Sequence, residues 1–81
     1  MFAPHSREKI ERLRHLGITE EMVSSVVLNP ESVEASYFNR RVAQAALTRN
    51  LVLRVVFEEI NNTLLVVTVY PASRRRYAIE D

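Results

Sequence analysis

Basic and aromatic side chains near the C-terminus are the first candidates for chemistry in this chain. Tyr70 ends a long apolar run and is followed by Arg74, Arg75, Arg76 and Tyr77. Three adjacent guanidinium groups repel one another, so they need solvent, phosphate or acidic side chains around them. The bases of single-stranded RNA stack on tyrosine and arginine planes. The segment therefore indicates either an ordinary solvated surface or a contact with RNA.

Arg54 is the second candidate, because it interrupts an apolar strand. It lies between Val52 and Val56 on one face of that strand, where a guanidinium needs a carboxylate, carbonyl groups or an anionic ligand. A two-residue turn before the strand would place small Ala45 opposite Arg54 and leave room above it. Two interpretations stay open: Arg54 binds an anion such as phosphate, or an internal partner such as Glu58 neutralises it.

His5 is the third candidate, since histidine alone changes protonation near neutral pH without help from its surroundings. Arg12 follows seven residues later and falls on the same side of the first predicted helix. We expect this pair at a rim of the sheet. His5 then either transfers a proton there or packs against the C-terminal segment as an ordinary residue at a helix start.

Composition excludes several kinds of site. The chain has no cysteine, which rules out disulfide scaffolds and thiolate zinc sites, and its single glycine rules out glycine-rich phosphate loops. The carboxylates lie on predicted helix surfaces, turns and strand ends, so no metal cluster is expected. We expect no cofactor. RNA cleavage suits such a protein, because the 2′-hydroxyl is an internal nucleophile and the protein supplies positioning, positive charge and proton transfer.

The net charge of +1 hides an uneven distribution. Residues 1–39 hold four basic and six acidic residues, whereas residues 40–79 hold seven basic and only two acidic residues. Ten of the eleven basic residues are arginine, which suits bidentate contacts with phosphate or carboxylate better than lysine does. A general bias toward arginine would produce the same count. The basic half is where we expect a partner.

Two short helices are predicted before residue 30, and they must position the basic half. From His5 to Leu16 apolar residues recur every three positions between charged ones, which indicates a one-sided surface helix. Gly17 ends this helix, because glycine adopts the left-handed conformation of a helix C-terminus. Thr19 caps the second helix, and Pro30 stops it. We expect the helices, about residues 5–29, to form a hairpin.

Four strands follow, because the apolar period changes to two and β-branched residues dominate. The last two are apolar on both faces, which predicts that they are the central strands, and Pro71 should end the last one. Asn61-Asn62 is typical of a two-residue turn with positive φ, and Arg49-Asn50 is a weaker signal of the same kind. The predicted strands are Ser32–Phe38, Arg41–Thr48, Leu51–Ile60 and Thr63–Tyr70.

Two-residue turns define a register for these strands. Arg54 then faces Ala45 on one neighbour and Val69 on the other. The same register sets Arg41 opposite Glu58, and Arg40 opposite Glu59. Cross-strand opposite charges stabilise a sheet. A structural role for Arg40 and Arg41 is therefore favoured over a ligand role.

The sequence as a whole predicts one α+β domain over residues 1–81, with the helical hairpin packed on a four-stranded antiparallel sheet and a basic tail at 71–81. No apolar run is long enough for a membrane helix and no signal peptide opens the chain, so we expect no membrane partner and a cytoplasmic location.

The chain resembles a set of small uncharacterised prokaryotic domains related to the RelE/ParE toxin superfamily, which implies the same hairpin-on-sheet fold. The ending Ser73-Arg74-Arg75-Arg76-Tyr77 is similar to that of BrnT toxins. The resemblance rests on His5, Arg12, the segments Gly17-Ile18-Thr19-Glu20-Glu21 and Asn29-Pro30, and the strands 53–59 and 66–71.

The resemblance implies a toxin-like, metal-independent endoribonuclease of a toxin–antitoxin system, held in check by an antitoxin protein encoded nearby and acting on RNA or at the ribosome. The positions that match the residues used by such toxins are Arg54, Arg74 to Arg76, and Tyr77, with the tyrosine in proton transfer. His5 and Arg12 match residues typical of the uncharacterised set, without an assigned role. ParE-like relatives act on gyrase. A non-catalytic protein- or RNA-binding module of the same fold, including a gyrase-type or inactive relative, is therefore the alternative.

Overall fold

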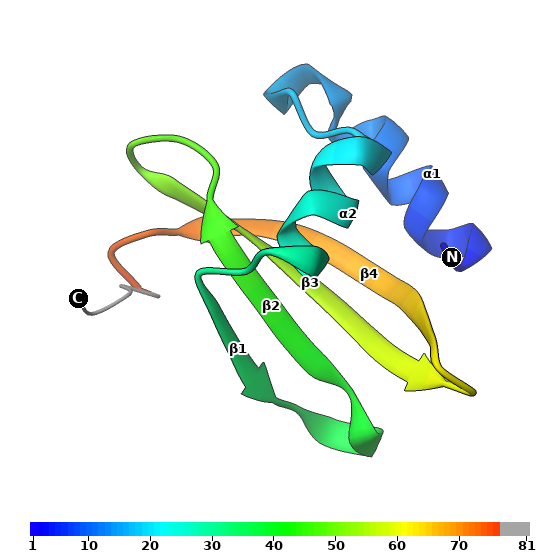
Figure 1. The fold of residues 1–81 in the computed structure, drawn as a ribbon. Helices are drawn as coiled ribbons and strands as arrows, with labels where there is room; N and C mark the ends of the chain where they lie inside the picture. The colour runs from blue at the N-terminus through cyan, green and yellow to red at the C-terminus, as the bar shows by residue number, and fades with distance from the viewer. Residues whose placement is uncertain (77–81) are drawn as a thin grey trace.

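The computed structural model describes residues 1–76 and arranges two helices on one face of a four-stranded sheet (Figure 1). Two 3₁₀ turns, η1 and η2, interrupt the connections. The elements in chain order are α1 (Pro4–Arg12), η1 (Arg14–Leu16), α2 (Glu20–Leu28), β1 (Ser32–Ala35), η2 (Tyr37–Asn39), β2 (Arg41–Ala46), β3 (Leu51–Ile60) and β4 (Thr63–Ser73). The α+β class and the four-stranded antiparallel sheet agree with the sequence prediction.

Gly17 and Thr19 adopt the local conformations predicted for them. Gly17 closes η1 with a φ of 80°, in the left-handed region. Thr19 caps α2, because its hydroxyl accepts a hydrogen bond of 3.2 Å from the amide of Met22. Glu20 and Glu21 follow in the first turn, where the helix dipole favours negative charge.

The predicted hairpin of two helices is wrong. The first helix ends at Arg12, and η1 occupies the rest of its expected range. The main packing partner of α1 is β4, whereas α2 packs on β2 and β3. Each helix thus buries its apolar side against the sheet. The three-residue apolar period was misleading, because it is the period of a 3₁₀ helix as well as an approximation to that of an α-helix.

The strand order is β1-β2-β3-β4, so β2 and β3 are central and β4 is an edge strand, contrary to the prediction. The N-terminus covers part of that edge: Phe2 bridges to Val66, whose carbonyl accepts a hydrogen bond of 3.0 Å from the amide of Ala3. Pro71 does not end β4, since an edge strand tolerates a missing N–H group.

The turn at Asn61-Asn62 forms as predicted, with φ values of 51° and 65° and Ile60 paired with Thr63. The register then shifts by one residue, because Phe57 faces Val66 whereas Val56 faces Thr68. Such a shift inserts one extra residue on β4. Arg54 therefore faces Tyr70 rather than Val69.

The connection between β2 and β3 is longer than predicted and spans residues 47–50. The Thr48 hydroxyl holds it by accepting hydrogen bonds from the amides of Asn50 and Leu51, at 3.2 and 3.1 Å. The pairing of β2 with β3 differs from the predicted register by one residue. Gln44 therefore lies opposite Arg54, in place of Ala45.

The first strand is shorter than expected, because β1 ends at Ala35 and η2 turns the chain into β2. Phe38 and Asn39 both adopt a φ of 59° in this turn. A strand cannot continue through two left-handed residues.

The hydrophobic core lies between the helices and one face of the sheet. The helix side contributes Ile10, Ile18, Val23 and Val26, and the sheet contributes Ala43, Leu53, Val55, Phe57, Val66 and Val69. Residues that alternate with these on the strands point to the opposite side, here termed the Arg54 face, which includes Glu34, Gln44, Arg54 and Tyr70. No helix within residues 1–76 has the length and apolar character needed to cross a membrane.

Candidate functional site

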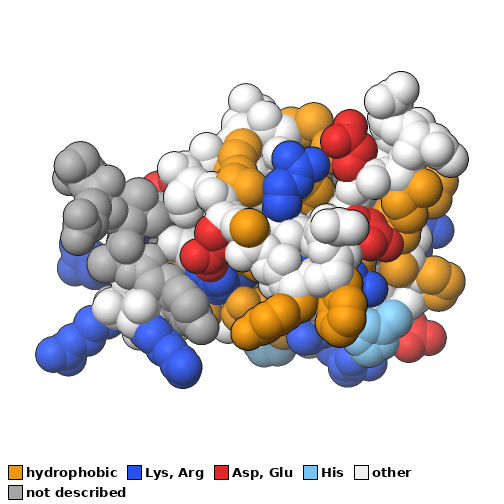
Figure 2. Space-filling view, turned by 90° about the horizontal axis from the view of Figure 1, so that it is seen from below, with side chains coloured by type: hydrophobic (Ala, Val, Ile, Leu, Met, Phe, Trp, Pro, Cys, Tyr) orange, Lys and Arg blue, Asp and Glu red, His pale blue; other side chains and the backbone are white. Residues whose placement is uncertain are grey.

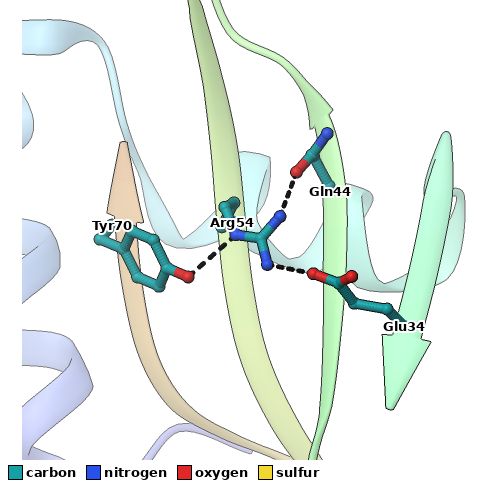
Figure 3. Close-up of polar contacts among 4 residues, drawn as sticks. All are labelled: Glu34, Gln44, Arg54 and Tyr70. Carbon is teal, nitrogen blue, oxygen red and sulfur yellow. Dashed lines mark hydrogen bonds and ion pairs between the residues drawn. The ribbon is translucent and has the colours of Figure 1, made fainter. Parts of the chain in front are cut away.

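All four strands contribute one side chain to a polar cluster on the Arg54 face (Figure 3). Gln44 on β2 and Tyr70 on β4 lie directly opposite Arg54 in the two ladders. Glu34 reaches the same guanidinium from β1, two strands away. We term these four residues the Arg54 network.

The guanidinium of Arg54 donates in three directions. Its Nε donates a hydrogen bond of 2.9 Å to the Tyr70 hydroxyl, its Nη1 donates to the Gln44 amide oxygen, and its Nη2 forms an ion pair with the Glu34 carboxylate. The Cζ atom of Arg54 also lies 5.8 Å from the centre of the Tyr70 ring. Partners on three sides hold the planar guanidinium in one orientation.

Exposure differs sharply within the network. Arg54 is only 6% exposed, whereas the Glu34 side chain is 60% exposed. Burial acts to lower the pKa of Arg54, but the hydrogen bonds to Glu34 and Tyr70 outweigh it, and the pKa is raised above its usual value. The site is therefore a permanent cation beneath a carboxylate that solvent can reach.

This arrangement can support proton transfer beside a developing negative charge. A carboxylate accepts a proton, a phenol hydroxyl can donate one while it accepts a hydrogen bond, and a fixed guanidinium stabilises an anion. Glu34, Tyr70 and Arg54 provide these three groups, and the guanidinium of Arg54 contacts both of the others. Within residues 1–76 no group of three or more histidine, aspartate or glutamate side chains is placed to hold a metal ion.

The internal partner of Arg54 is a glutamate, but it is Glu34 and not Glu58. Glu58 lies 3.8 Å from Nε of Arg40, and Glu59 lies 3.6 Å from Nη2 of Arg41. Arg40 and Arg41 thus pair with glutamates as expected, with exchanged partners, because the register of β2 against β3 differs by one residue.

Two other sequence candidates lie on α1. His5 and Arg12 are exposed on α1, and Lys9, between them on the same helix, places its Nζ 5.9 Å from the centre of the Tyr70 ring. Among residues 1–76, Tyr70 is the aromatic candidate that joins the Arg54 network.

The triple arginine lies in an exposed turn after β4. The amide of Arg74 donates a hydrogen bond of 2.9 Å to the carbonyl of Asn50, and the amide of Arg76 donates one of 3.1 Å to the carbonyl of Ser73. The first bond attaches the turn to the β2–β3 connection, and the second closes the turn itself. Tyr77 lies outside the described residues.

Sequence reasoning missed Glu34 and Gln44. Both alternate with core-facing positions of their strands, so a correct register would have pointed to them. Thr48 was a signal in the sequence for the correct β2–β3 register, because its hydroxyl suits a turn longer than two residues.

Comparison with known proteins gives one match. Residues 5–71 match the model of a family described as a domain of unknown function, DUF4258. The matched segment contains the whole Arg54 network and α1 from His5 onward, and it leaves the triple arginine outside. No curated protein and no solved structure matches the chain significantly.

Proposed function

This chain belongs to the DUF4258 family, and we propose that it is a toxin-like, metal-independent endoribonuclease that cleaves RNA by attack of the 2′-hydroxyl on the adjacent phosphate. The observation that carries the proposal is the Arg54 network, in which one buried cation holds an exposed carboxylate and a phenol hydroxyl. The resemblance to the RelE/ParE superfamily and the basic second half of the chain support the same activity.

In the proposed reaction the Glu34 carboxylate takes the proton of the 2′-hydroxyl. The 2′-oxygen forms a bond to phosphorus, and Arg54 stabilises the extra negative charge of the phosphorane. As the bond from phosphorus to the 5′-oxygen breaks, Tyr70 gives its proton to that oxygen. The products are a 2′,3′-cyclic phosphate and a 5′-hydroxyl.

Gln44 has a positioning role in this scheme. It is 4% exposed and accepts from Nη1 of Arg54, so it fixes the plane of the guanidinium. Charge interactions are stronger where water is excluded. A phosphate bound at the Glu34 edge would therefore meet a cation whose orientation Gln44 already fixes.

The proposal includes a partner and a location. An antitoxin that covers the Arg54 face would prevent RNA from reaching Glu34, whose side chain is 60% exposed. The activity requires the compartment that holds messenger RNA, which is the cytoplasm.

A second candidate is a non-catalytic binding module of the same fold. It is favoured by the low exposure of Arg54, 6%, and by the three partners that already surround the guanidinium. A phosphate would have to replace one of them. Cleavage assays separate the two candidates.

The test is cleavage of a single-stranded oligoribonucleotide by the purified protein in the presence of a chelator. We expect fragments that end in a 2′,3′-cyclic phosphate, and we expect Glu34→Gln to lower the rate by about 10²- to 10⁴-fold, the usual contribution of a general base. Absence of such fragments with RNA that still binds the protein would establish the binding module instead.

A matched control is Glu59→Gln. Glu59 also pairs with an arginine, Arg41, but at the end of the sheet and on the helix side. We expect Glu59→Gln to retain wild-type cleavage. Equal losses in the two variants would show that Glu34 acts through the fold and not through the reaction.

A further inference from the structure

The cations of α1 are divided between two sides of the helix. Arg7 lies 3.7 Å from the Glu20 carboxylate, and Arg14, just after the helix, lies 3.1 Å from that of Glu11. His5, Lys9 and Arg12 have no carboxylate partner within residues 1–76. The pairing therefore leaves the charges of Lys9 and Arg12 available to an external anion.

The three side chains without a carboxylate partner form a stripe. They occupy positions i, i+4 and i+7, which fall on one side of an α-helix. We term His5, Lys9 and Arg12 the α1 stripe. With a rise of about 1.5 Å per residue, it extends for about 10 Å along the helix.

The α1 stripe lies beside the Arg54 network. The helix packs on β4, and Lys9 Nζ reaches the Tyr70 ring at 5.9 Å, while Arg54 Cζ lies 5.8 Å from the same ring. One aromatic ring thus joins the stripe to the buried cation. Figure 2 shows histidine and basic side chains gathered along the lower margin of this view.

We propose that the α1 stripe binds the phosphate backbone of single-stranded RNA on one side of the phosphate held at Arg54. This inference rests on the proposed function for the position of the cleaved bond. Lys9 and Arg12 provide the charge, and His5 extends the stripe. A linear series of cations suits a chain with one negative charge per nucleotide, and lysine is an effective point charge for phosphate.

The substrate class follows from this geometry. Cleavage requires only the phosphate at Arg54, whereas the stripe requires additional phosphates along the strand. We therefore expect longer RNA to react faster than a dinucleotide, because contacts remote from the reacting atoms contribute to transition-state binding.

The first experiment measures binding without cleavage. The probe is a fluorescently labelled 2′-O-methyl oligonucleotide of twelve residues, titrated at several salt concentrations. We expect Lys9→Gln/Arg12→Gln to weaken binding by about fivefold per cation at 0.1 M salt. The slope of log K against log salt should fall by about 0.7 for each phosphate that the variant no longer neutralises. Because this probe cannot be cleaved, the result does not depend on catalysis.

The matched control is Arg7→Gln/Arg14→Gln, which removes the same charge from the paired cations. We expect less than a twofold change in affinity. Equal weakening in both double variants would overturn the stripe and leave a general effect of net charge. Lys9→Arg should retain most of the affinity that Lys9→Gln removes.

The second experiment compares substrates. Lys9→Gln/Arg12→Gln should slow cleavage of a twelve-residue RNA by a larger factor than cleavage of a dinucleotide, which has one phosphate. Slowing of both substrates by the same factor would overturn the flanking contact, since the variant would then act at the reaction itself. If polyglutamate competes with the oligonucleotide equally well, and loses affinity in the same stripe variant, the surface binds an acidic protein and the proposal is wrong.

Discussion

The two faces of β3 perform different tasks with alternate residues of one strand. The helix side presents Leu53, Val55 and Phe57, which are buried in the shared apolar core. The other side presents Arg54 to partners from three further strands. Apolar contacts are non-directional and tolerate exchange, whereas a buried cation depends on the position of each partner. The helix side thus supplies stability, whereas the Arg54 face holds the groups on which the proposed chemistry depends.

The largest expected change in stability comes from a substitution on the helix side of β3. Leu53 is 1% exposed and packs in the core, so Leu53→Ala should lower the free energy of unfolding by about 2–5 kcal/mol through reduced burial and a cavity. Urea denaturation followed by circular dichroism measures this. A loss below 1 kcal/mol would show that the core does not depend on this side of β3.

A smaller loss in the free energy of unfolding is expected when the Arg54 network is broken. Gln44→Leu removes the acceptor of Arg54 Nη1, which should cost about 1.5–3 kcal/mol because a buried charged donor is left without this acceptor. The same urea titration applies.

The double variant Arg54→Met/Gln44→Leu sharpens this result. It should be more stable than Gln44→Leu alone, because apolar residues then replace both partners of a buried contact. A double variant that is less stable than the single one would contradict the view that Arg54 is retained for chemistry.

A still smaller effect concerns the hydroxyl of the network. Tyr70→Phe removes the acceptor of the 2.9 Å hydrogen bond from Arg54 and should cost about 0.5–1.5 kcal/mol. Tyr37→Phe is the control, since Tyr37 is 83% exposed, and should change stability by less than 0.5 kcal/mol. Thermal unfolding of both variants gives the difference. Equal values would mean that Tyr70 contributes no hydrogen bond to the network.

The smallest effect is expected at the end of the sheet. Arg41 and Glu59 lie 3.6 Å apart with side chains about half exposed. A double-mutant cycle should give a coupling energy of about 0.2–1 kcal/mol that falls as salt is added. A coupling above 2 kcal/mol, independent of salt, would place this exposed pair in the same class as the Arg54 network.

Local features of the fold were predictable because their causes lie within a few residues. Gly17 and the Asn61-Asn62 turn adopt the positive φ that their residue types favour, and Thr19 caps α2 with its hydroxyl. The four strands were recognised for the same reason. The hairpin of helices was wrong, since the packing of α1 on β4 depends on residues far apart in the sequence.

The candidate site was predictable in part. Arg54 and Tyr70 could be named because a charge within an apolar strand and an aromatic residue at its end are visible in the sequence. Their contact could not, because it follows from the register shift between Val56 and Phe57. The contacts of Glu34 and Gln44 with Arg54 likewise follow from the strand register, which the sequence did not reveal.

The sequence by itself determined the element types, most turn positions and the presence of one arginine that needs partners on an apolar strand. Only the tertiary structure decided which partners these are. A one-residue difference in the β2–β3 register turns every side chain of one strand to the other face relative to its neighbour. Gln44 rather than Ala45 thus lies opposite Arg54, and the long-range pairing that brings Glu34 and Tyr70 to the same cation has no local signal in the chain.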